Sequence, residues 1–281
     1  MIGVYDSGYG GLTVLRQLRQ RLPDRDYVYL GDSGRAPYGG RDIHTILDFS
    51  EQCVERLFEE GCRLVIVACH SVSCVALRHL QRRYAGVDSD VRVLGVSIPG
   101  AEAAVAASAG HIGLIGTEAT VRSGTYGVEL AKLGPHRLSA VAAPVLPPIV
   151  EEGWEATDVA HAAVRRYLQA LSGIDTLLLA CTHFPLLGEA FEAAVPPGVR
   201  VLDPAPHVAE ATASWLARHP SFDAGGTGQL RVLCSGDPVR FAEHGERFLG
   251  QPLPVVQHVA EVDGRLAHRD PSDRPVGQVV R

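Results

Sequence analysis

Two cysteines occupy matching places in this sequence. Cys69 follows the apolar run at residues 65–68, and Cys181 follows a similar run at residues 177–180, so the two thiols lie 112 positions apart. Short apolar runs rich in Val, Ile and Leu are typical of buried strands. Each cysteine is therefore expected where a strand leaves its sheet, which is the edge where ligands bind in open α/β sheets.

Several reactions are open to two cysteines in such places. A thiol has an ordinary pKa of about 8.5, and only the thiolate is a base or a nucleophile. The two thiols could form a redox pair, one of them could be a nucleophile, or both could transfer protons. A symmetric pair suits a symmetric reaction such as inversion of a stereocentre, in which one group removes a proton and the other returns one on the opposite face.

Two further side chains could assist a thiol. His183 lies two residues after Cys181, and Asp6 lies in the first glycine-rich turn. Either group could hold a thiol in its reactive state or accept its proton. The alternative interpretation is structural, with His183 as a hydrogen-bonded core histidine and Asp6 as a turn or helix-capping residue.

The elements that must position these groups alternate along the chain. Strands are expected at residues 2–5, 27–30, 64–68, 91–96, 111–115, 141–145, 176–180, 200–202, 230–234 and 255–256. Helices are expected at residues 14–22, 42–60, 72–84, 120–133, 157–171, 186–194, 208–218 and 238–249. Such alternation predicts βαβ units and parallel sheets, which is an α/β fold. The polar tail from Asp263 onward is expected to be loosely ordered.

The pattern also repeats with an offset of roughly 110 residues. Gly3 aligns with Gly113, and Cys69 aligns with Cys181. We therefore expect two pseudo-symmetric three-layer αβα domains with mostly parallel sheets. A cleft between the domains would bring both cysteines to one site, and domain interfaces are preferred places for small-molecule sites.

Composition excludes some classes of function. The chain has 281 residues, a net charge of -6 and a pI near 6.0, so no electrostatic reason exists to expect nucleic acid. No run approaches the roughly 18 apolar residues of a membrane span. The first residues enter a strand at once, without the pattern of a signal peptide, and we expect a cytoplasmic protein. Its six cysteines show no CxxC or zinc spacing, so neither disulfides nor a metal is expected.

Seven short motifs follow one another from residue 2 to about residue 249. They are residues 6–15 (DSGYGGLTVL), Gly31-Asp32 with Pro37-Tyr38-Gly39, residues 67–69 (VAC), Gly116-Thr117 with Thr120 and Ser123-Gly124, residues 150–153 (VEEG), residues 181–187 (CTHFPLL), and residues 235–237 (SGD). In this order and spacing, the motifs make the chain resemble glutamate racemases of the aspartate/glutamate racemase superfamily.

This resemblance implies an isomerase that interconverts L- and D-glutamate without a cofactor. The substrate would be a small amino acid, and the D-glutamate formed would enter peptidoglycan. The resemblance also implies two α/β domains with the site between them. The first would comprise residues 1–97 and 208–281, and the second residues 98–207. A homodimer is one assembly that the sequence leaves open.

The resemblance also implies roles for individual residues. Cys69 and Cys181 would be the two acid/base groups, acting on opposite faces of Cα. Asp6 would assist Cys69, while His183 and Glu151 would assist Cys181. Substrate would contact Ser7, Pro37, Tyr38, Gly39, His70, Ser71, Thr117, Thr120 and Thr182.

One departure keeps the substrate open. The family usually has Cys-Asn-Thr where this chain has Cys69-His70-Ser71. His70 is larger than asparagine, can be charged, and offers different hydrogen-bond geometry. One alternative is therefore a related racemase acting on aspartate or another small amino acid. Another is a scaffold that has lost catalysis and binds a ligand or protein partner. A dithiol oxidoreductase is disfavoured because neither cysteine has a partner in CxxC spacing.

Overall fold

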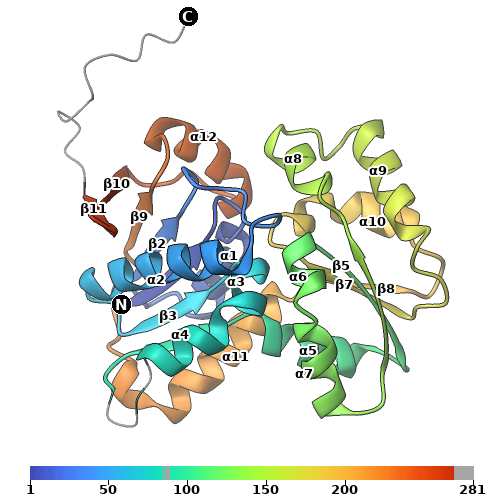
Figure 1. Ribbon diagram of the computed structural model, residues 1–281, viewed down its shortest axis with the longest axis horizontal. Helices are drawn as coiled ribbons and strands as arrows, with labels where there is room; N and C mark the ends of the chain where they lie inside the picture. Colours follow the sequence, from blue (N-terminus) through green and yellow to red (C-terminus); the bar gives the residue numbers. More distant parts are fainter. Residues whose placement is uncertain (85, 87–88, 269–281) are drawn as a thin grey trace, which may run out of the picture.

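The computed structural model describes residues 1–84, 86 and 89–268, which form two sheets flanked by helices (Figure 1). The larger sheet contains β1 (Ile2–Asp6), β2 (Tyr27–Gly31), β3 (Leu64–Val67), β4 (Arg92–Gly95), β9 (Leu230–Cys234), β10 (Val256–Val262) and β11 (Arg265–His268). The smaller sheet contains β5 (His111–Gly116), β6 (Arg137–Ala142), β7 (Thr176–Ala180) and β8 (Arg200–Leu202).

Strand order confirms the internal repeat and the mostly parallel α/β fold. The seven-stranded sheet has the order β11-β10-β9-β2-β1-β3-β4, and the four-stranded sheet has the order β6-β5-β7-β8. The segment β2-β1-β3-β4 therefore has the same arrangement as β6-β5-β7-β8. Among the described strands, the β10–β11 pair is antiparallel and the other pairs are parallel. Cys69 and Cys181 follow β3 and β7, which are equivalent strands.

Both sheets are the middle layer of three. One face of the larger sheet packs on α1 (Leu12–Arg21), α11 (Ala205–Arg218) and α12 (Pro238–Leu249), and the other on α2 (Ile43–Glu59), α3 (His70–Val75) and α4 (Leu77–Tyr84). The smaller sheet packs on α8 (Leu146–Glu151), α9 (Asp158–Leu168) and α10 (Gly188–Ala194) on one face, and on α5 (Ser97–Ala107) and α7 (Thr125–Leu133) on the other. Alternation along β3 explains this, because Leu64 and Ile66 enter one core while Val65 and Val67 enter the other.

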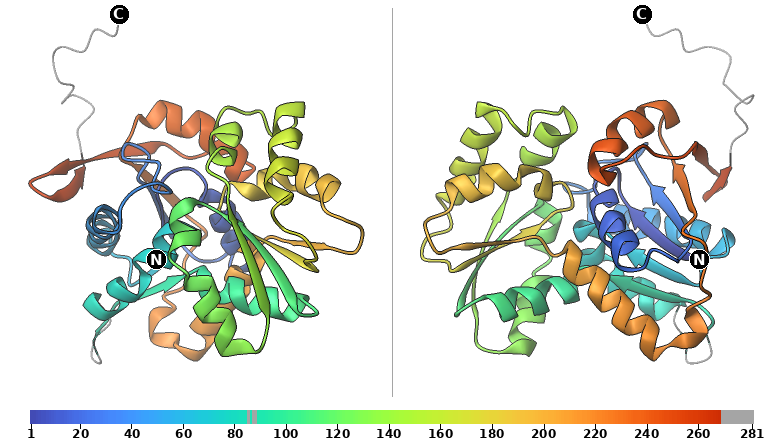
Figure 2. Two further views of the ribbon diagram at one scale, coloured as in Figure 1. Left: turned by 45° about the vertical axis from the view of Figure 1, so that its right-hand side comes forward. Right: turned by 180° about the vertical axis from the view of Figure 1, so that it is seen from behind.

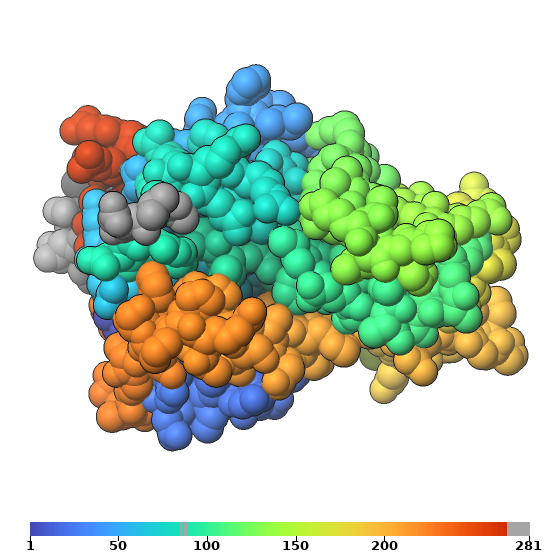
Figure 3. All heavy atoms as spheres, turned by 90° about the horizontal axis from the view of Figure 1, so that it is seen from below, coloured from blue at the N-terminus to red at the C-terminus, as the bar shows by residue number. Residues whose placement is uncertain are grey.

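The chain returns to the larger sheet after β8. Helix α11 packs against α1 and α5, and Figure 3 shows it in orange beside the N-terminal residues in blue. Strands β9 to β11 then extend the sheet that contains β1, as the two views of Figure 2 show. This path agrees with a discontinuous first domain, although the boundaries at residues 97 and 208 stay predictions.

One predicted strand was misplaced. Residues 141–145 were expected to form a strand, but β6 is Arg137–Ala142 and α8 begins at Leu146. β6 lies at the edge of its sheet, where its side chains are exposed or only partly buried, so polar residues such as Arg137 and Ser139 interrupt the apolar run that would reveal a strand. Pro144 has no N–H to donate and lies just beyond the strand.

The C-terminal prediction was also wrong for residues 263–268. β10 and β11 form a hairpin, and Asp263 (φ 50°) and Gly264 (φ 78°) make its turn. Asp-Gly is a typical two-residue hairpin sequence, because both positions require positive φ. Residues 269–281 of the predicted tail lie outside the described residues. Helix α5 was not predicted, and the helix expected at residues 72–84 is divided into α3 and α4. Within the described ranges, no helix has the length and apolarity needed to cross a membrane.

Candidate active site

A cavity of about 400 Å³ lies at the carboxyl ends of strands from both sheets. Cys69 reaches it from the end of β3 and Cys181 from the end of β7. The predicted site residues that line the cavity are Ser7, Pro37, Tyr38, Gly39, Cys69, His70, Ser71, Thr117, Glu151, Cys181, Thr182 and His183. The fold therefore brings twelve of the fourteen predicted residues to one place.

The Cys69 thiol is buried and lies close to the acidic residue Asp6. Cys69 caps the N-terminus of α3, and its Sγ lies 3.4 Å from the Ser7 Oγ. Burial raises the pKa of Cys69 to about 12, and the neighbouring negative charge of Asp6 adds to this rise. The thiol form of Cys69 is therefore strongly favoured at neutral pH.

Asp6 lies behind the cavity wall at the end of β1 and is fully buried. Burial raises the pKa of its carboxyl group, although the charge of His183 opposes the rise. The Gly8 N–H donates to Oδ1 at 2.9 Å, and the Thr182 hydroxyl donates to Oδ2 at 3.3 Å. Asp6 therefore acts on Cys69 through its charge, while its hydrogen bond to Thr182 reaches the other half of the site.

Cys181 has a basic neighbour. Its Sγ lies 3.8 Å from the His183 Nδ1, and the His183 Nε2 lies 2.9 Å from the Glu151 Oε1. Burial by itself lowers the pKa of His183, but its hydrogen bonds to Cys181 and Glu151 outweigh this effect and raise the pKa to about 10. A protonated imidazole places a positive charge beside the Cys181 sulfur. The two cysteines therefore occupy opposite electrostatic environments.

Glu151 is the last residue of α8, and its side chain binds His183. Although burial opposes ionisation, the hydrogen bond to His183 lowers the pKa of the Glu151 carboxyl group. Between the adjacent glutamates, Glu151 lines the cavity and contacts the histidine.

A chain of hydroxyl groups crosses the cavity wall. The Ser71 Oγ lies 2.8 Å from the Thr117 Oγ1, which in turn donates to the Thr120 Oγ1 at 3.0 Å. Ser71 belongs to α3, whereas Thr117 caps α6 (Glu118–Arg122), so the chain joins the two halves of the molecule. Thr120 was predicted to bind substrate, but it stands behind Thr117 and does not line the cavity.

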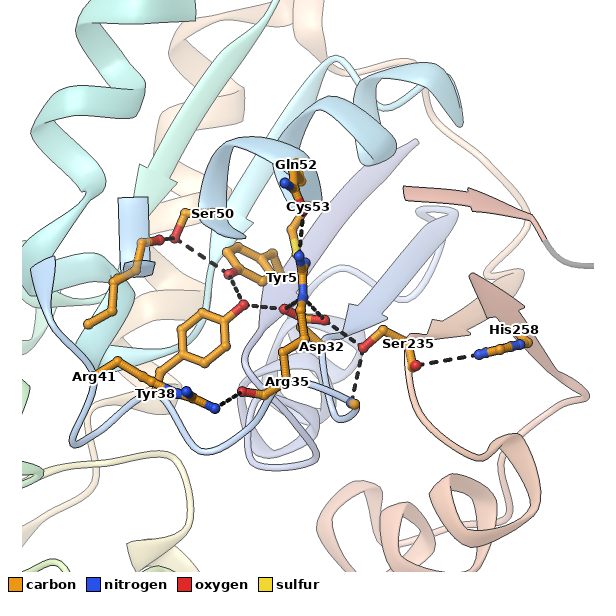
Figure 4. A network of polar contacts seen from close by, with 12 residues as sticks. Tyr5, Asp32, Arg35, Tyr38, Arg41, Ser50, Gln52, Cys53, Ser235 and His258 are labelled. Carbon is orange, nitrogen blue, oxygen red and sulfur yellow. Dashed lines mark hydrogen bonds and ion pairs between the residues drawn. The ribbon is translucent and has the colours of Figure 1, made fainter. Parts of the chain in front are cut away.

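The loop after β2 forms another wall, and a polar network behind the wall holds it (Figure 4). The Tyr38 hydroxyl donates to the Asp32 carboxylate, which also accepts from Arg35 at 2.8 Å and from Ser235 at 2.5 Å. Tyr38 therefore lines the cavity while its hydroxyl group binds into the network. On the same loop, a Cβ at Gly39 would lie 3.0 Å from the Thr117 Cβ, so the close approach favours glycine.

His70 lines the cavity as a neutral side chain. Its Nδ1 lies 2.8 Å from the Tyr126 hydroxyl of α7, and the two rings stack at an interplanar angle of 25°. Burial lowers the pKa of His70 to about 3. His70 therefore offers hydrogen bonds rather than a positive charge to a ligand.

Sequence reasoning missed several residues of the cavity wall. They are Gly8, Ala36, Gly40, Glu118, Pro144, Pro147 and Pro148. Each lies in a segment that follows the carboxyl end of β1, β2, β5 or β6, so the rule that ligands bind at these strand ends could have found them. In the part of the chain that the structure describes, no cluster of three or more His, Cys, Asp or Glu side chains could hold a metal ion.

Comparison with known proteins decides the family. The model of the Asp/Glu/Hydantoin racemase family matches residues 11–212. The chain belongs to the Asp/Glu/Hydantoin racemase family. It is accordingly an amino-acid racemase, which is an isomerase.

Individual members of this family match nearly the whole length of this chain in sequence and in structure. The glutamate racemase of Syntrophus aciditrophicus is 38% identical over 263 residues, which cover 92% of this chain and 96% of that protein. The crystal structure of glutamate racemase from Thermus thermophilus in complex with β-chloro-D-alanine has a TM-score of 0.82 and 37% identity, covering 92% of this chain and 96% of that one. The enzyme from Francisella tularensis, solved with D-glutamate, has a TM-score of 0.84 and 27% identity, covering 92% and 97%. The resemblance to glutamate racemases is confirmed.

Proposed function

We propose that this racemase interconverts L- and D-glutamate by transferring protons between Cα and two thiols. The observation that carries the proposal is the presence of Cys69 and Cys181 in one cavity, each at the end of an equivalent strand in one of two repeats. The relatives that match nearly the whole chain are glutamate racemases, and the Francisella tularensis enzyme was solved with D-glutamate.

The surroundings of the two thiols suggest one direction of the reaction. In this direction the Cys181 sulfur, beside His183, reacts as the base, and Cys69 reacts as the thiol. The Cys181 sulfur takes the Cα proton of one enantiomer, and the Cys69 S–H returns a proton to the opposite face. One C–H bond breaks and one forms, so atoms and charge balance. The other enantiomer uses the thiols in reversed roles, and we assign to Asp6 the proton exchange at Cys69 that this reversal requires.

The cavity also addresses the weak acidity of the Cα–H group. An amino-acid carboxylate resists a second negative charge on the adjacent carbon. Hydroxyl groups of Ser7, Ser71, Thr117 and Thr182 line the cavity. As charge develops, they can turn their O–H bonds toward that carboxylate, and Thr117 and Thr182 then give up the bonds they donate to Thr120 and Asp6. The buried position keeps such hydrogen bonds strong because little water competes with them.

Substitution of each cysteine tests the two-thiol mechanism. We expect Cys69→Ala and Cys181→Ala each to abolish racemisation, because either change removes one of the two proton carriers. Each variant should still exchange the α-proton of one enantiomer with solvent deuterium, which NMR would detect. Cys62→Ala is the matched control, since this buried thiol lies outside the cavity, and it should keep its activity. Full activity in either of the first two variants would refute the mechanism.

A second substrate is the main competing proposal. His70 follows Cys69, lines the cavity and is neutral, so it could select aspartate or another small amino acid. Measurements of kcat/KM over a panel of amino acids separate these proposals. The glutamate assignment fails if glutamate is turned over no faster than the background reaction.

We further propose that the protein works in the cytoplasm as a homodimer and supplies D-glutamate for peptidoglycan. Expression in a bacterium that requires added D-glutamate should restore growth without the supplement. Cys181→Ala should fail to restore growth. Growth with that variant would show that the proposed reaction is not the source of the D-glutamate used for peptidoglycan.

A further inference from the structure

Helix α12 extends from the larger sheet toward the acid/base pair at Cys181. Its residues Phe241 and Phe248 are fully buried. Their rings pack on Tyr9 with centroid distances of 4.9 Å and 6.2 Å. Figure 1 shows α12 and α8 opposite each other at the same end of the molecule, one from each half. The helix is therefore firmly held on its own half while it faces the other.

Two side chains of α12 bind the end of α8. The Arg247 guanidinium donates to the carbonyl of Val150, and its Nη1 lies 3.5 Å from the carbonyl of Glu151. The His244 Nδ1–H donates to the same Glu151 carbonyl at 3.1 Å. Arg247 also contacts both carboxylate oxygens of Glu155 at 3.0 Å.

These contacts provide hydrogen-bond donors for backbone carbonyl groups at the end of α8. The last carbonyl groups of an α-helix lack partners within the helix, and cationic side chains there also oppose the negative end of the helix dipole. Backbone N–H groups of Gly153 and Trp154 bind the carbonyls of Val150 and Ile149, whereas side chains of α12 bind the carbonyl of Glu151. The residue whose backbone α12 holds is therefore the residue whose carboxylate holds His183.

The same helix also contacts the histidine directly. The ring of Phe248 meets the His183 ring edge to face, with a centroid distance of 5.2 Å and an interplanar angle of 79°. Helix α12 thus touches both His183 and the backbone of Glu151. Cys69, in contrast, is flanked by Ser7 and Asp6 of the first glycine-rich turn.

We propose that Arg247 and His244 are positioning residues which, from the opposite half of the molecule, fix the Glu151–His183 pair that serves Cys181. This inference rests on the proposed two-thiol mechanism and extends it. Removal of these contacts impairs proton transfer at Cys181 more than at Cys69. The two directions of α-proton exchange therefore become unequal.

Arg247→Ala tests the proposal in the full-length protein. Displacement of a catalytic group by a remote substitution can cost up to about 100-fold in rate. We expect kcat to fall about 10-fold to 100-fold while KM changes much less, because the substrate contacts remain. Deuterium exchange should slow mainly for the enantiomer that Cys181 deprotonates, which is the one that Cys69→Ala still exchanges. Arg247→Lys should recover part of the activity.

Control variants exclude a general loss of structure. Arg21→Ala breaks an exposed ion pair with Glu210 and should leave both exchange rates unchanged. Glu155→Gln removes the carboxylate partner of Arg247 while keeping the carbonyl contacts, and should give the same unequal exchange to a smaller extent. It keeps the test decisive if Arg247→Ala does not fold. Equal slowing of both exchange reactions, or an unchanged kcat, in the folded variant would overturn the proposal.

A measurement without substrate separates this inference from the proposed function. We expect the His183 pKa, followed by NMR titration of the free protein, to be lower in Arg247→Ala, because Glu151 is less well placed to stabilise the imidazolium. An unchanged His183 pKa would overturn the positioning role whichever amino acid the enzyme uses. Absence of glutamate turnover in the parent protein would contradict the proposed substrate alone.

Discussion

At the scale of single residues, two identical thiols differ through their neighbours. Cys69 is buried beside Asp6, which favours its protonated form, whereas Cys181 is next to a histidine that is itself held by Glu151. The two thiols therefore face neighbouring groups of opposite charge in the same cavity. The proposed two-thiol reaction can use this difference, because one group must take a proton while the other gives one.

The raised pKa of His183 predicts a pH-dependent stability. Histidine in an unfolded chain has a pKa of about 6.5, and His183 in the folded protein has a pKa of about 10. Protonated His183 therefore stabilises the folded state fully below about pH 6.5, and this contribution is lost as the pH rises through about 10. Urea denaturation at several pH values should show a steeper fall in the free energy of unfolding for the parent than for His183→Gln. Parallel curves would contradict this assignment.

At the scale of elements, the segments after the strands form the site, and some need support from behind. The loop at residues 33–40 has little regular structure, yet it supplies Pro37, Tyr38 and Gly39 to the cavity. Asp32 lies at its start and binds Tyr38, Arg35 and Ser235. One buried carboxylate therefore joins the segments after β2 and β9.

Asp32→Ala should destabilise the protein and weaken substrate binding. Removal of one partner from a buried ion pair typically costs about 3–5 kcal/mol, because the other charge stays buried. Arg35 has a side chain only 17% exposed and would lose that partner. We expect this loss in urea denaturation, together with a raised KM as the loop relaxes. Asp90→Ala is the control, because its pair with Arg63 is exposed and contributes at most about 1 kcal/mol. Similar losses in both variants would exclude a special role for Asp32.

At the scale of the whole molecule, the two repeats make tight contact beside the cavity that they enclose. The first glycine-rich turn lies against the segment after β7, so a Cβ at Gly10 would lie 2.2 Å from the Thr182 Oγ1 and 2.6 Å from the His183 Nδ1. The Thr13 hydroxyl also donates to the carbonyl of Thr182 at 3.1 Å. Contact between the halves is therefore made by the same residues that surround the thiols.

Gly10→Ala should separate the halves at the site. The added methyl group must displace Thr182 or His183, and overpacking of this kind costs about 1–3 kcal/mol. We expect kcat/KM to fall by more than about 10-fold, which corresponds to roughly 1.4 kcal/mol in the transition state. The matched change is Gly127→Ala within α7, where a Cβ has 3.8 Å to the nearest atom, and it should raise stability by about 0.5–1 kcal/mol. Unaltered kcat/KM in Gly10→Ala would show that the halves tolerate the extra volume.

The sequence by itself determined the features that depend on neighbours along the chain. Apolar runs predicted most strands, their repeated order predicted two equivalent sheets, and the positions of Cys69 and Cys181 at strand ends predicted one shared site. Short motifs predicted the family and most of the residues that line the cavity. Where the local pattern was weak, as in the edge strand β6, the strand was predicted at the wrong residues.

Only the tertiary structure decided how distant residues act on one another. Tyr126 contacts the His70 ring from 56 positions away, and α12 binds Glu151 through His244 from 93 positions away. Such pairs leave no periodic signal in the sequence, because packing of separate elements creates them. The opposite environments of the two thiols have the same origin, since the burial and neighbouring charges that shift a pKa exist only once the halves have closed.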